Sequence, residues 1–185
     1  MNKTWTTARL CRAGVIAALY VALTYAFGGL AHNGFLQIRP AEALCILPLF
    51  FVEAVPALYV GCMLSNVTSP FVIYDVFIGS LATLLAALFS YMVGRFLKKD
   101  VVKLSLGGIF PVIFNALIIP LVIVFLCGDM GGQQTALSAY LFFAASMFVT
   151  QSVWVYGLGT PLYFFINRMQ KRGSPLFLDG GRKNL

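Results

Sequence analysis

Long stretches without a charged residue constrain this fold more than any other feature of the sequence. Four of them cover residues 13–31, 76–94, 104–127 and 136–167, and a helix needs about 20 apolar residues to cross a bilayer. Charged residues make up 10% of the 185 residues, against about 25% in soluble domains. With a mean hydropathy of +0.89, the chain is predicted to be an all-α integral membrane protein with one domain, 1–185.

The basic residues indicate which parts of the chain face the cytoplasm. Positive residues gather on the cytoplasmic side of membrane proteins. Here they precede the first apolar stretch, cluster in 95–103 and follow the last stretch: Lys3, Arg9, Arg12, Arg95, Lys98, Lys99, Lys103, Arg168, Lys171, Arg172, Arg182 and Lys183. Both termini and the segment 95–103 are therefore predicted to be cytoplasmic, and the +7 net charge requires no nucleic-acid partner.

The number of crossings follows from this assignment, because an even number must separate the N-terminus from the segment 95–103. The stretch 40–74 is too apolar to remain in water, yet its 35 residues make only about 53 Å of helix. We therefore expect two short crossings there and six transmembrane helices in total. Their approximate ranges are 9–31, 41–52, 54–68, 76–97, 104–127 and 136–169, with 170–185 as a cytoplasmic tail.

The two short helices have consequences for the loops beside them. Their reversal falls at Glu53, which is expected at the cytoplasmic interface, and Pro56 suits the first turn of the second helix. The loops around 32–40 and 69–75 should then dip into the bilayer. Irregular backbone is tolerated at that depth only where it packs against protein or lines a cavity.

Two charged residues lie at the edge of the apolar region, in the stretch NGFLQIRPAEAL. Arg39 and Glu42 would each cost about 2.5–3.5 kcal/mol at a lipid-facing helix centre. They are therefore expected to face inward and to pair with each other or with a ligand. A simpler alternative is that Glu42 only stabilises the start of a helix begun by Pro40, with Arg39 as its partner.

Further polar residues interrupt the apolar segments at similar depth: Asn66, Asp75, Asn115 and Gln151. Any one of them alone would more often make a helix–helix hydrogen bond. Several together favour one pocket, in which amides, carboxylates and an arginine pair with the edge of a small planar heterocycle. Trp154 and Tyr156 follow Gln151 and could supply an aromatic face.

The first apolar stretch carries small residues at four-residue spacing, Gly14, Ala18, Ala22 and Ala26, with Ala13 and Ala17 beside them. Small residues at this spacing allow another helix to approach closely. Two interpretations remain open: packing within this chain, or a docking face for a partner subunit.

The sequence contains none of the motifs that would indicate an enzyme or a metal site. Walker A, G-x-S-x-G and H-E-x-x-H patterns are absent, and His32 is the single histidine. The cysteines have no C-x-x-C spacing and are interpreted as small buried hydrophobic residues; they are Cys11, Cys45, Cys62 and Cys127. We expect no catalysis, no metal and no cofactor.

The segments LQIRPAEALCILPLFFVEAVPALYVGCMLSN, DVFIGSLATLLAALFSY and VYGLGTPL resemble the QueT family, the substrate-binding S components of energy-coupling factor (ECF) transporters. The resemblance covers roughly 8–170 and is most specific in 37–49 and 75–88. It implies a six-helix fold with an outward-facing site closed by the loops after helices 1, 3 and 5. It also implies that the small-residue face of helix 1 meets a transmembrane coupling subunit, and that two ATPase subunits supply the energy.

The same resemblance implies a queuosine precursor, a deazaguanine base, as ligand. Its N–H donors would give Glu42 or Asp75 a role, Arg39 or an amide would meet its carbonyl oxygen, and Gln37 joins the candidate site residues. The implied location is a bacterial cell membrane, crossed several times. The alternatives are another vitamin-like ligand, or a stand-alone secondary transporter, which an inverted repeat would favour; the sequence shows no such repeat.

Overall fold

The regular structure of the chain is helical. The computed structural model describes residues 5–33, 37–97, 99–173 and 177, so parts of the predicted loop 32–40, of the basic segment 95–103 and of the tail 170–185 lie outside the described residues. The elements, in chain order, are α1 Thr7–Phe27, η1 Gly28–His32, η2 Pro40–Leu49, α2 Ala54–Asn66, α3 Val72–Tyr74, η3 Asp75–Gly79, α4 Ser80–Phe96, α5 Asp100–Leu121, η4 Val122–Leu126, α6 Ala136–Ser152, η5 Val153–Leu158 and α7 Gly159–Lys171. The described residues contain no strand, which confirms the prediction of an all-α chain.

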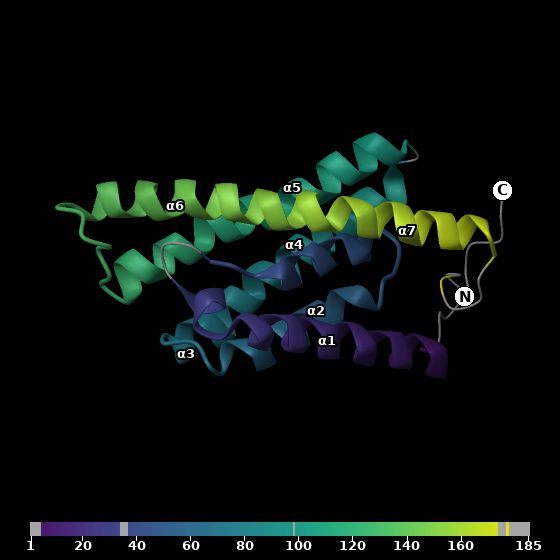
Figure 1. The fold of residues 1–185 in the computed structure, drawn as a ribbon, viewed down its shortest axis with the longest axis horizontal. Helices are drawn as coiled ribbons and strands as arrows, with labels where there is room; N and C mark the ends of the chain where they lie inside the picture. The colour runs from purple at the N-terminus through teal and green to yellow at the C-terminus, as the bar shows by residue number, and fades with distance from the viewer. Residues whose placement is uncertain (1–4, 34–36, 98, 174–176, 178–185) are drawn as a thin grey trace.

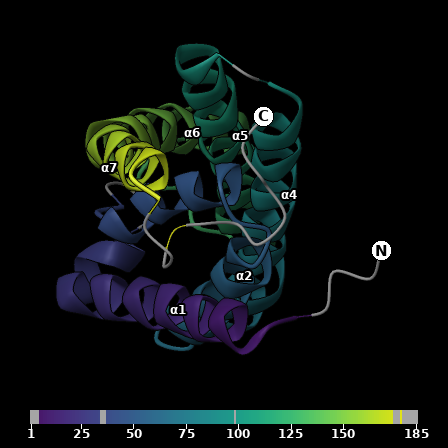
Figure 2. The same ribbon diagram turned by 90° about the vertical axis from the view of Figure 1, so that its right-hand side faces the viewer.

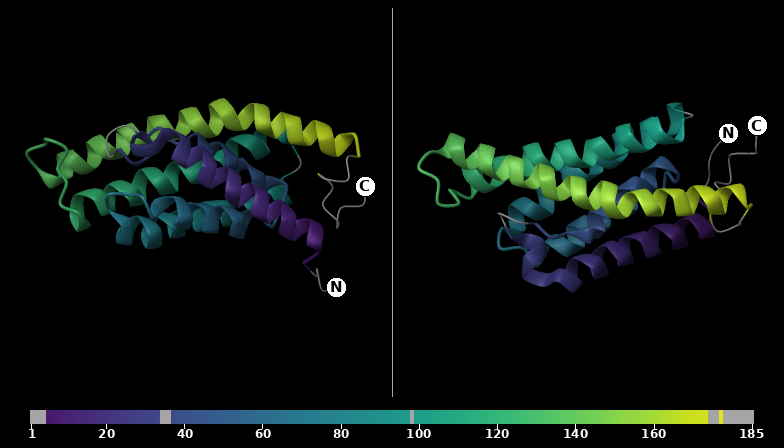
Figure 3. Two further views of the ribbon diagram at one scale, coloured as in Figure 1. Left: turned by 60° about the horizontal axis from the view of Figure 1, so that its bottom comes forward. Right: turned by 45° about the horizontal axis from the view of Figure 1, so that its top comes forward.

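Four continuous helical segments are long and apolar enough to cross a membrane: Thr7–His32, Val72–Phe96, Asp100–Leu126 and Ala136–Lys171. Two further apolar helices, η2 and α2, are shorter. The last of the four has 36 residues and runs through α6, η5 and α7 as one rod (Figure 3). At 1.5 Å per residue it is about 54 Å long, so it exceeds a hydrocarbon core of about 30 Å.

The short helix η2 lies at the centre of the bundle. Figure 2 shows it between α1 on one side, the α6–α7 rod on another, and α2, α4 and α5 on the third. All ten of its residues are buried. A helix whose residues are apolar on every side is stable only when other elements surround it, and PAEALCILPL has one charged residue, Glu42.

The winding of η2 is tighter than that of an α-helix, since it is a 3₁₀ helix from Pro40 to Leu49. Pro48 has no amide hydrogen to donate. A rise of about 2.0 Å per residue gives the ten residues a length of about 20 Å, where an α-helix would reach about 15 Å. The 13 residues of α2 also make about 20 Å. Neither helix alone matches the full thickness of a hydrocarbon core.

Glycines allow the surrounding helices to approach η2 closely. A Cβ atom at Gly94 of α4 would lie 2.5 Å from the backbone oxygen of Leu49, and one at Gly107 of α5 would overlap the Leu49 side chain. Between α1 and α2, a Cβ at Gly61 would lie 3.0 Å from the Cβ of Tyr20. These positions hold the backbones of α2, α4 and α5 against the core.

The start of α1, the end of α7 and the junction of α4 with α5 lie at one end of the bundle (Figure 1). Contacts at this end join distant segments. Lys171 lies 3.7 Å from Asp100, the Lys103 ammonium lies 5.0 Å from the Phe50 ring centroid, and Arg12 pairs with Glu53 at 2.6 Å. The described basic residues other than Arg39 belong to these segments, which we call the basic end.

Gly94→Ala should lower the stability of the protein by about 1–3 kcal/mol, because the added methyl group meets rigid backbone of η2. Gly14→Ala is the matched control, since a Cβ there has no atom within 4 Å and alanine favours a helix by about 1 kcal/mol over glycine. Thermal unfolding of the two purified variants in detergent measures the difference. Equal stabilities would show that α4 does not approach η2 as described.

Candidate functional site

Arg39 and Glu42 lie buried together at the start of η2, toward the end of the bundle away from the basic end (Figure 1). Arg39 is 6% exposed and Glu42 is 1% exposed. The Arg39 Nε atom lies 3.9 Å from Glu42 Oε1, which is an ion pair but too long for a hydrogen bond. The pair forms because residues three apart at the start of a helix share one side.

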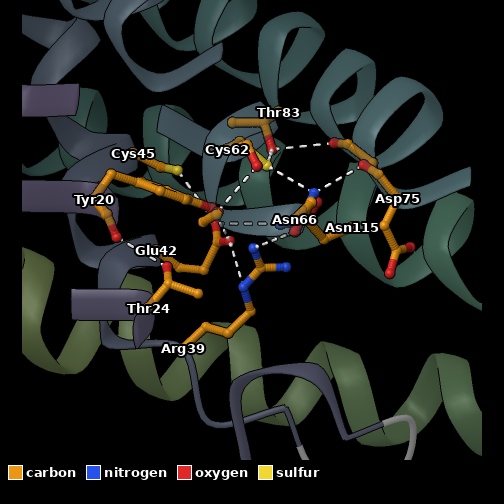
Figure 4. Close-up of polar contacts among 12 residues, drawn as sticks. Tyr20, Thr24, Arg39, Glu42, Cys45, Cys62, Asn66, Asp75, Thr83 and Asn115 are labelled. Atoms are coloured by element: carbon orange, nitrogen blue, oxygen red, sulfur yellow. Dashed lines mark hydrogen bonds and ion pairs between the residues drawn. The ribbon is translucent and has the colours of Figure 1, made fainter. Parts of the chain in front are cut away.

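The Glu42 carboxylate accepts hydrogen bonds from three side chains, which belong to α1, η2 and α5 (Figure 4). The Tyr20 hydroxyl of α1 donates to Oε1 at 2.8 Å. The Cys45 thiol and the Asn115 amide of α5 both donate to Oε2 at 3.3 Å. With Arg39 alongside, these partners use the roughly four lone-pair positions of a carboxylate. Glu42 therefore joins α1, η2 and α5, and its role exceeds that of a helix-terminal residue.

Asn66 at the end of α2 links Arg39 to the start of the next long helix. Arg39 Nη2 donates to Asn66 Oδ1 at 3.0 Å, and Asn66 Nδ2 donates to the backbone oxygen of Asp75 at 2.8 Å. The Asp75 carboxylate accepts a short hydrogen bond from the Ser69 hydroxyl. Figure 4 shows the guanidinium of Arg39 between Glu42 and Asn66, with Asp75 beyond them. The loop between α2 and α3 is thus tied to the Arg39–Glu42 pair.

The structure brings five predicted site residues into one group joined by hydrogen bonds and by the Arg39–Glu42 ion pair, which we call the polar cluster: Arg39, Glu42, Asn66, Asp75 and Asn115. Sequence reasoning did not include four residues that bond to this cluster or to one of its partners: Tyr20, Cys45, Cys62 and Thr83. Thr83 donates to the Cys62 sulfur at 3.4 Å, and the Asn66 amide does the same. The interpretation of the cysteines as plain hydrophobic residues is therefore incomplete for Cys45 and Cys62, and Cys11 is exposed.

The other predicted site residues make no bond to the polar cluster. Gln37 and Gln151 are buried, at 6% and 1% exposure. Trp154 is partly buried and packs on Phe27 of α1, with ring centroids 6.5 Å apart. The Tyr156 hydroxyl instead donates to the backbone oxygen of Ser105 at 2.8 Å, near the start of α5 and toward the basic end.

The small residues of α1 divide between its two sides. Ala13 and Ala17 are partly buried and pack against the core. The four at four-residue spacing are exposed: Gly14, Ala18, Ala22 and Ala26. Tyr20 and Thr24, on the other side of the helix, are fully buried. The helix therefore turns its polar side chains to the core and a surface of small residues outward.

Glu53 has no exposed surface and forms its ion pair with Arg12 where η2 turns into α2. Arg12 also lies over the ring of Phe51, 4.8 Å from its centroid. The reversal is thereby attached to α1 at the basic end. Among the described residues, no group of three or more His, Cys, Asp or Glu side chains is placed to hold a metal ion.

A bundle of long apolar helices that surrounds a few buried charged and amide groups is the architecture of a membrane transport protein. Intramembrane ionisable groups of this kind mark binding sites or pathways for polar solutes. The family model of the QueT transporter matches residues 10–168, and the chain belongs to this family. No curated protein and no solved structure matched the chain.

Tyr20→Phe should destabilise the protein by about 1–3 kcal/mol, because it removes a buried donor and leaves part of the Glu42 carboxylate unmatched. Tyr25→Phe is the control on the same helix: its hydroxyl donates to the backbone oxygen of Leu64 at 3.1 Å at an exposed position. Thermal unfolding of both variants gives the comparison. If Tyr20→Phe were as stable as Tyr25→Phe, the Tyr20–Glu42 bond would contribute nothing to the fold.

Proposed function

We propose that this chain is the substrate-binding S component of an ECF importer in a bacterial cell membrane, and that it binds a deazaguanine precursor of queuosine from outside the cell. Membership of the QueT transporter family supports a small-molecule transporter. The single observation that carries the proposal is the polar cluster, in which a charged pair at the start of η2 meets amide groups from α2 and α5 inside an apolar bundle.

The proposed topology has six crossings with both termini in the cytoplasm. Four long helices are available for full crossings. The remaining two crossings would be η2 and α2, which reverse at Glu53 beside Arg12. Because the basic end takes the cytoplasmic side, the polar cluster falls in the outer half of the membrane. A polar solute from outside then reaches it without passing the whole hydrocarbon core.

The chemistry of the polar cluster suits a small planar heterocycle with both hydrogen-bond donors and acceptors. Arg39 offers donors, while amide and carboxylate oxygens offer acceptors. The Trp154–Phe27 pair, between η5 and α1, supplies aromatic surface near the same end of the bundle. Such a mixture of apolar lining and a few fixed polar groups is typical of small-molecule sites.

Energy for uptake would come from partner subunits: a transmembrane coupling subunit and two ATPase subunits. The exposed small residues of α1 are the proposed contact with the coupling subunit, since they allow a helix to approach closely within the membrane. In this arrangement one side of α1 carries Tyr20, which binds Glu42, and the opposite side meets the partner.

Glu42→Gln should weaken binding of 7-deazaguanine by about 1–3 kcal/mol, or roughly tenfold to a hundredfold. The neutral amide cannot balance the Arg39 charge, so the polar cluster loses its arrangement. Calorimetry with the purified chain measures the affinity, against a panel of deazaguanines, guanine and vitamins. Asp129→Asn, in an exposed loop, is the matched control. An unchanged affinity would show that Glu42 does not belong to the site. If the wild-type chain bound a vitamin and none of the deazaguanines, the proposed ligand would be wrong and a vitamin would take its place.

Ala18→Leu combined with Ala22→Leu should abolish co-purification with the coupling subunit but leave 7-deazaguanine binding unchanged. Two isobutyl groups would keep a partner helix from approaching the small-residue side of α1. Ala145→Leu, at an exposed position of α6, controls for an added side chain facing lipid. Loss of ligand binding in the double variant would instead indicate that this side of α1 packs within the chain.

A further inference from the structure

The guanidinium of Arg39 has unused donors inside the bundle. Of its five N–H groups, one on Nη2 bonds to Asn66, whereas Nε is buried without a hydrogen bond among the described residues. Figure 4 shows the other terminal nitrogen without a partner in the polar cluster. Buried charged donors are costly to leave unmatched, so the unbonded N–H groups of Arg39 suit an acceptor on a ligand.

Gln151 presents the opposite chemistry. Its side chain is 1% exposed, and its Oε1 atom is buried without a hydrogen-bond partner among the described residues. A carbonyl oxygen in this state suits a donor that arrives with a ligand. Within the part of the chain that the structure describes, no hydrogen bond to this oxygen accounts for a polar residue here.

The packing of α6 and η5 against α5 brings Gln151 next to the helix that carries Asn115. One turn before it, Met147 packs in a cluster with Ala116. One turn after it, Val155 lies where a Cβ on Gly108 would meet its side chain at 3.2 Å. Gln151 therefore lies opposite the stretch of α5 between residues 108 and 116, which includes Asn115, the partner of Glu42.

Glu42, by contrast, is already occupied. Its oxygens accept from Tyr20, Cys45 and Asn115 and lie beside Arg39. A ligand N–H would have to displace one of these protein donors. Glu42 thus positions Arg39 and Asn115, and the acceptor left for a ligand is elsewhere.

We propose that Arg39 and Gln151 together recognise a cyclic amide edge of the ligand, with Arg39 donating to its C=O and Gln151 Oε1 accepting from its N–H. The inference rests on the proposed function and assigns the recognition of the deazaguanine lactam to these two residues. Gln151 is then a specificity-determining residue, and Glu42 is a positioning residue.

The test compares Gln151→Met, Gln151→Glu and the neighbouring control Thr150→Val, whose hydroxyl bonds only its own helix backbone. The probes are 7-deazaguanine and 1-methyl-7-deazaguanine, in which the lactam N–H is replaced. Calorimetry and thermal unfolding are measured on each purified chain. Methionine matches the length of glutamine but has no acceptor of comparable strength, whereas glutamate retains an acceptor oxygen.

Gln151→Met should bind 7-deazaguanine about tenfold to a hundredfold more weakly with an unfolding temperature no lower than wild type, since no protein hydrogen bond is lost. Gln151→Glu and Thr150→Val should keep the affinity within about fivefold, which is less than the loss expected for one buried hydrogen bond. Wild type should discriminate against the methylated probe, and Gln151→Met should lose most of that discrimination.

Equal affinity of wild type and Gln151→Met for 7-deazaguanine would overturn the inference while the proposed function stands. A drop in unfolding temperature or failure to fold in Gln151→Met would also overturn it, because Gln151 would then be structural. If Gln151→Glu binds as weakly as Gln151→Met, the residue is not an acceptor. If the wild-type chain bound none of the panel compounds, the proposed function would be refuted, and the role of Gln151 would not have been the cause.

Discussion

The structure depends on placing an arginine and a glutamate inside an apolar bundle without leaving either charge alone. Removing one member of such a buried pair typically costs 3–5 kcal/mol, so every element that touches the pair is fixed by it. Tyr20 of α1, Asn66 of α2 and Asn115 of α5 each supply one hydrogen bond. These bonds set the depth at which three helices meet η2. The apolar side chains of these helices then pack around Arg39, Glu42 and their hydrogen-bond partners.

The position of η2 explains how short helices coexist with long ones. Its ten residues are all buried, so its 3₁₀ winding is covered by other parts of the protein. A long lipid-facing helix at this position could not bring Glu42 to the centre of the bundle, because its other side would face hydrocarbon.

Much of this could be predicted from sequence because charged and amide side chains are rare and costly in apolar segments. Arg39, Glu42, Asn66 and Asn115 stood out for that reason, and the structure joins them. Tyr20 and Cys45 were missed because tyrosine and cysteine are common in apolar cores, and their hydrogen-bonding groups give no pattern in sequence. Tyr156 does not join the polar cluster. It lies in the stretch Val153–Leu158, which is wound as a π-helix, so α-helical spacing does not give its direction relative to Gln151.

The η2–α2 hairpin is attached to α1 at both of its ends. At the basic end Arg12 of α1 pairs with Glu53 at the reversal. At the other end Tyr20 of α1 binds Glu42, and Asn66 at the end of α2 binds Arg39. Between these points Gly61 allows α2 to approach Tyr20 and Ala17. Because polar bonds inside an apolar bundle are costly to break, α1, η2 and α2 form one unit. Through the Tyr20–Glu42 hydrogen bond, α1 is connected directly to the Arg39–Glu42 pair.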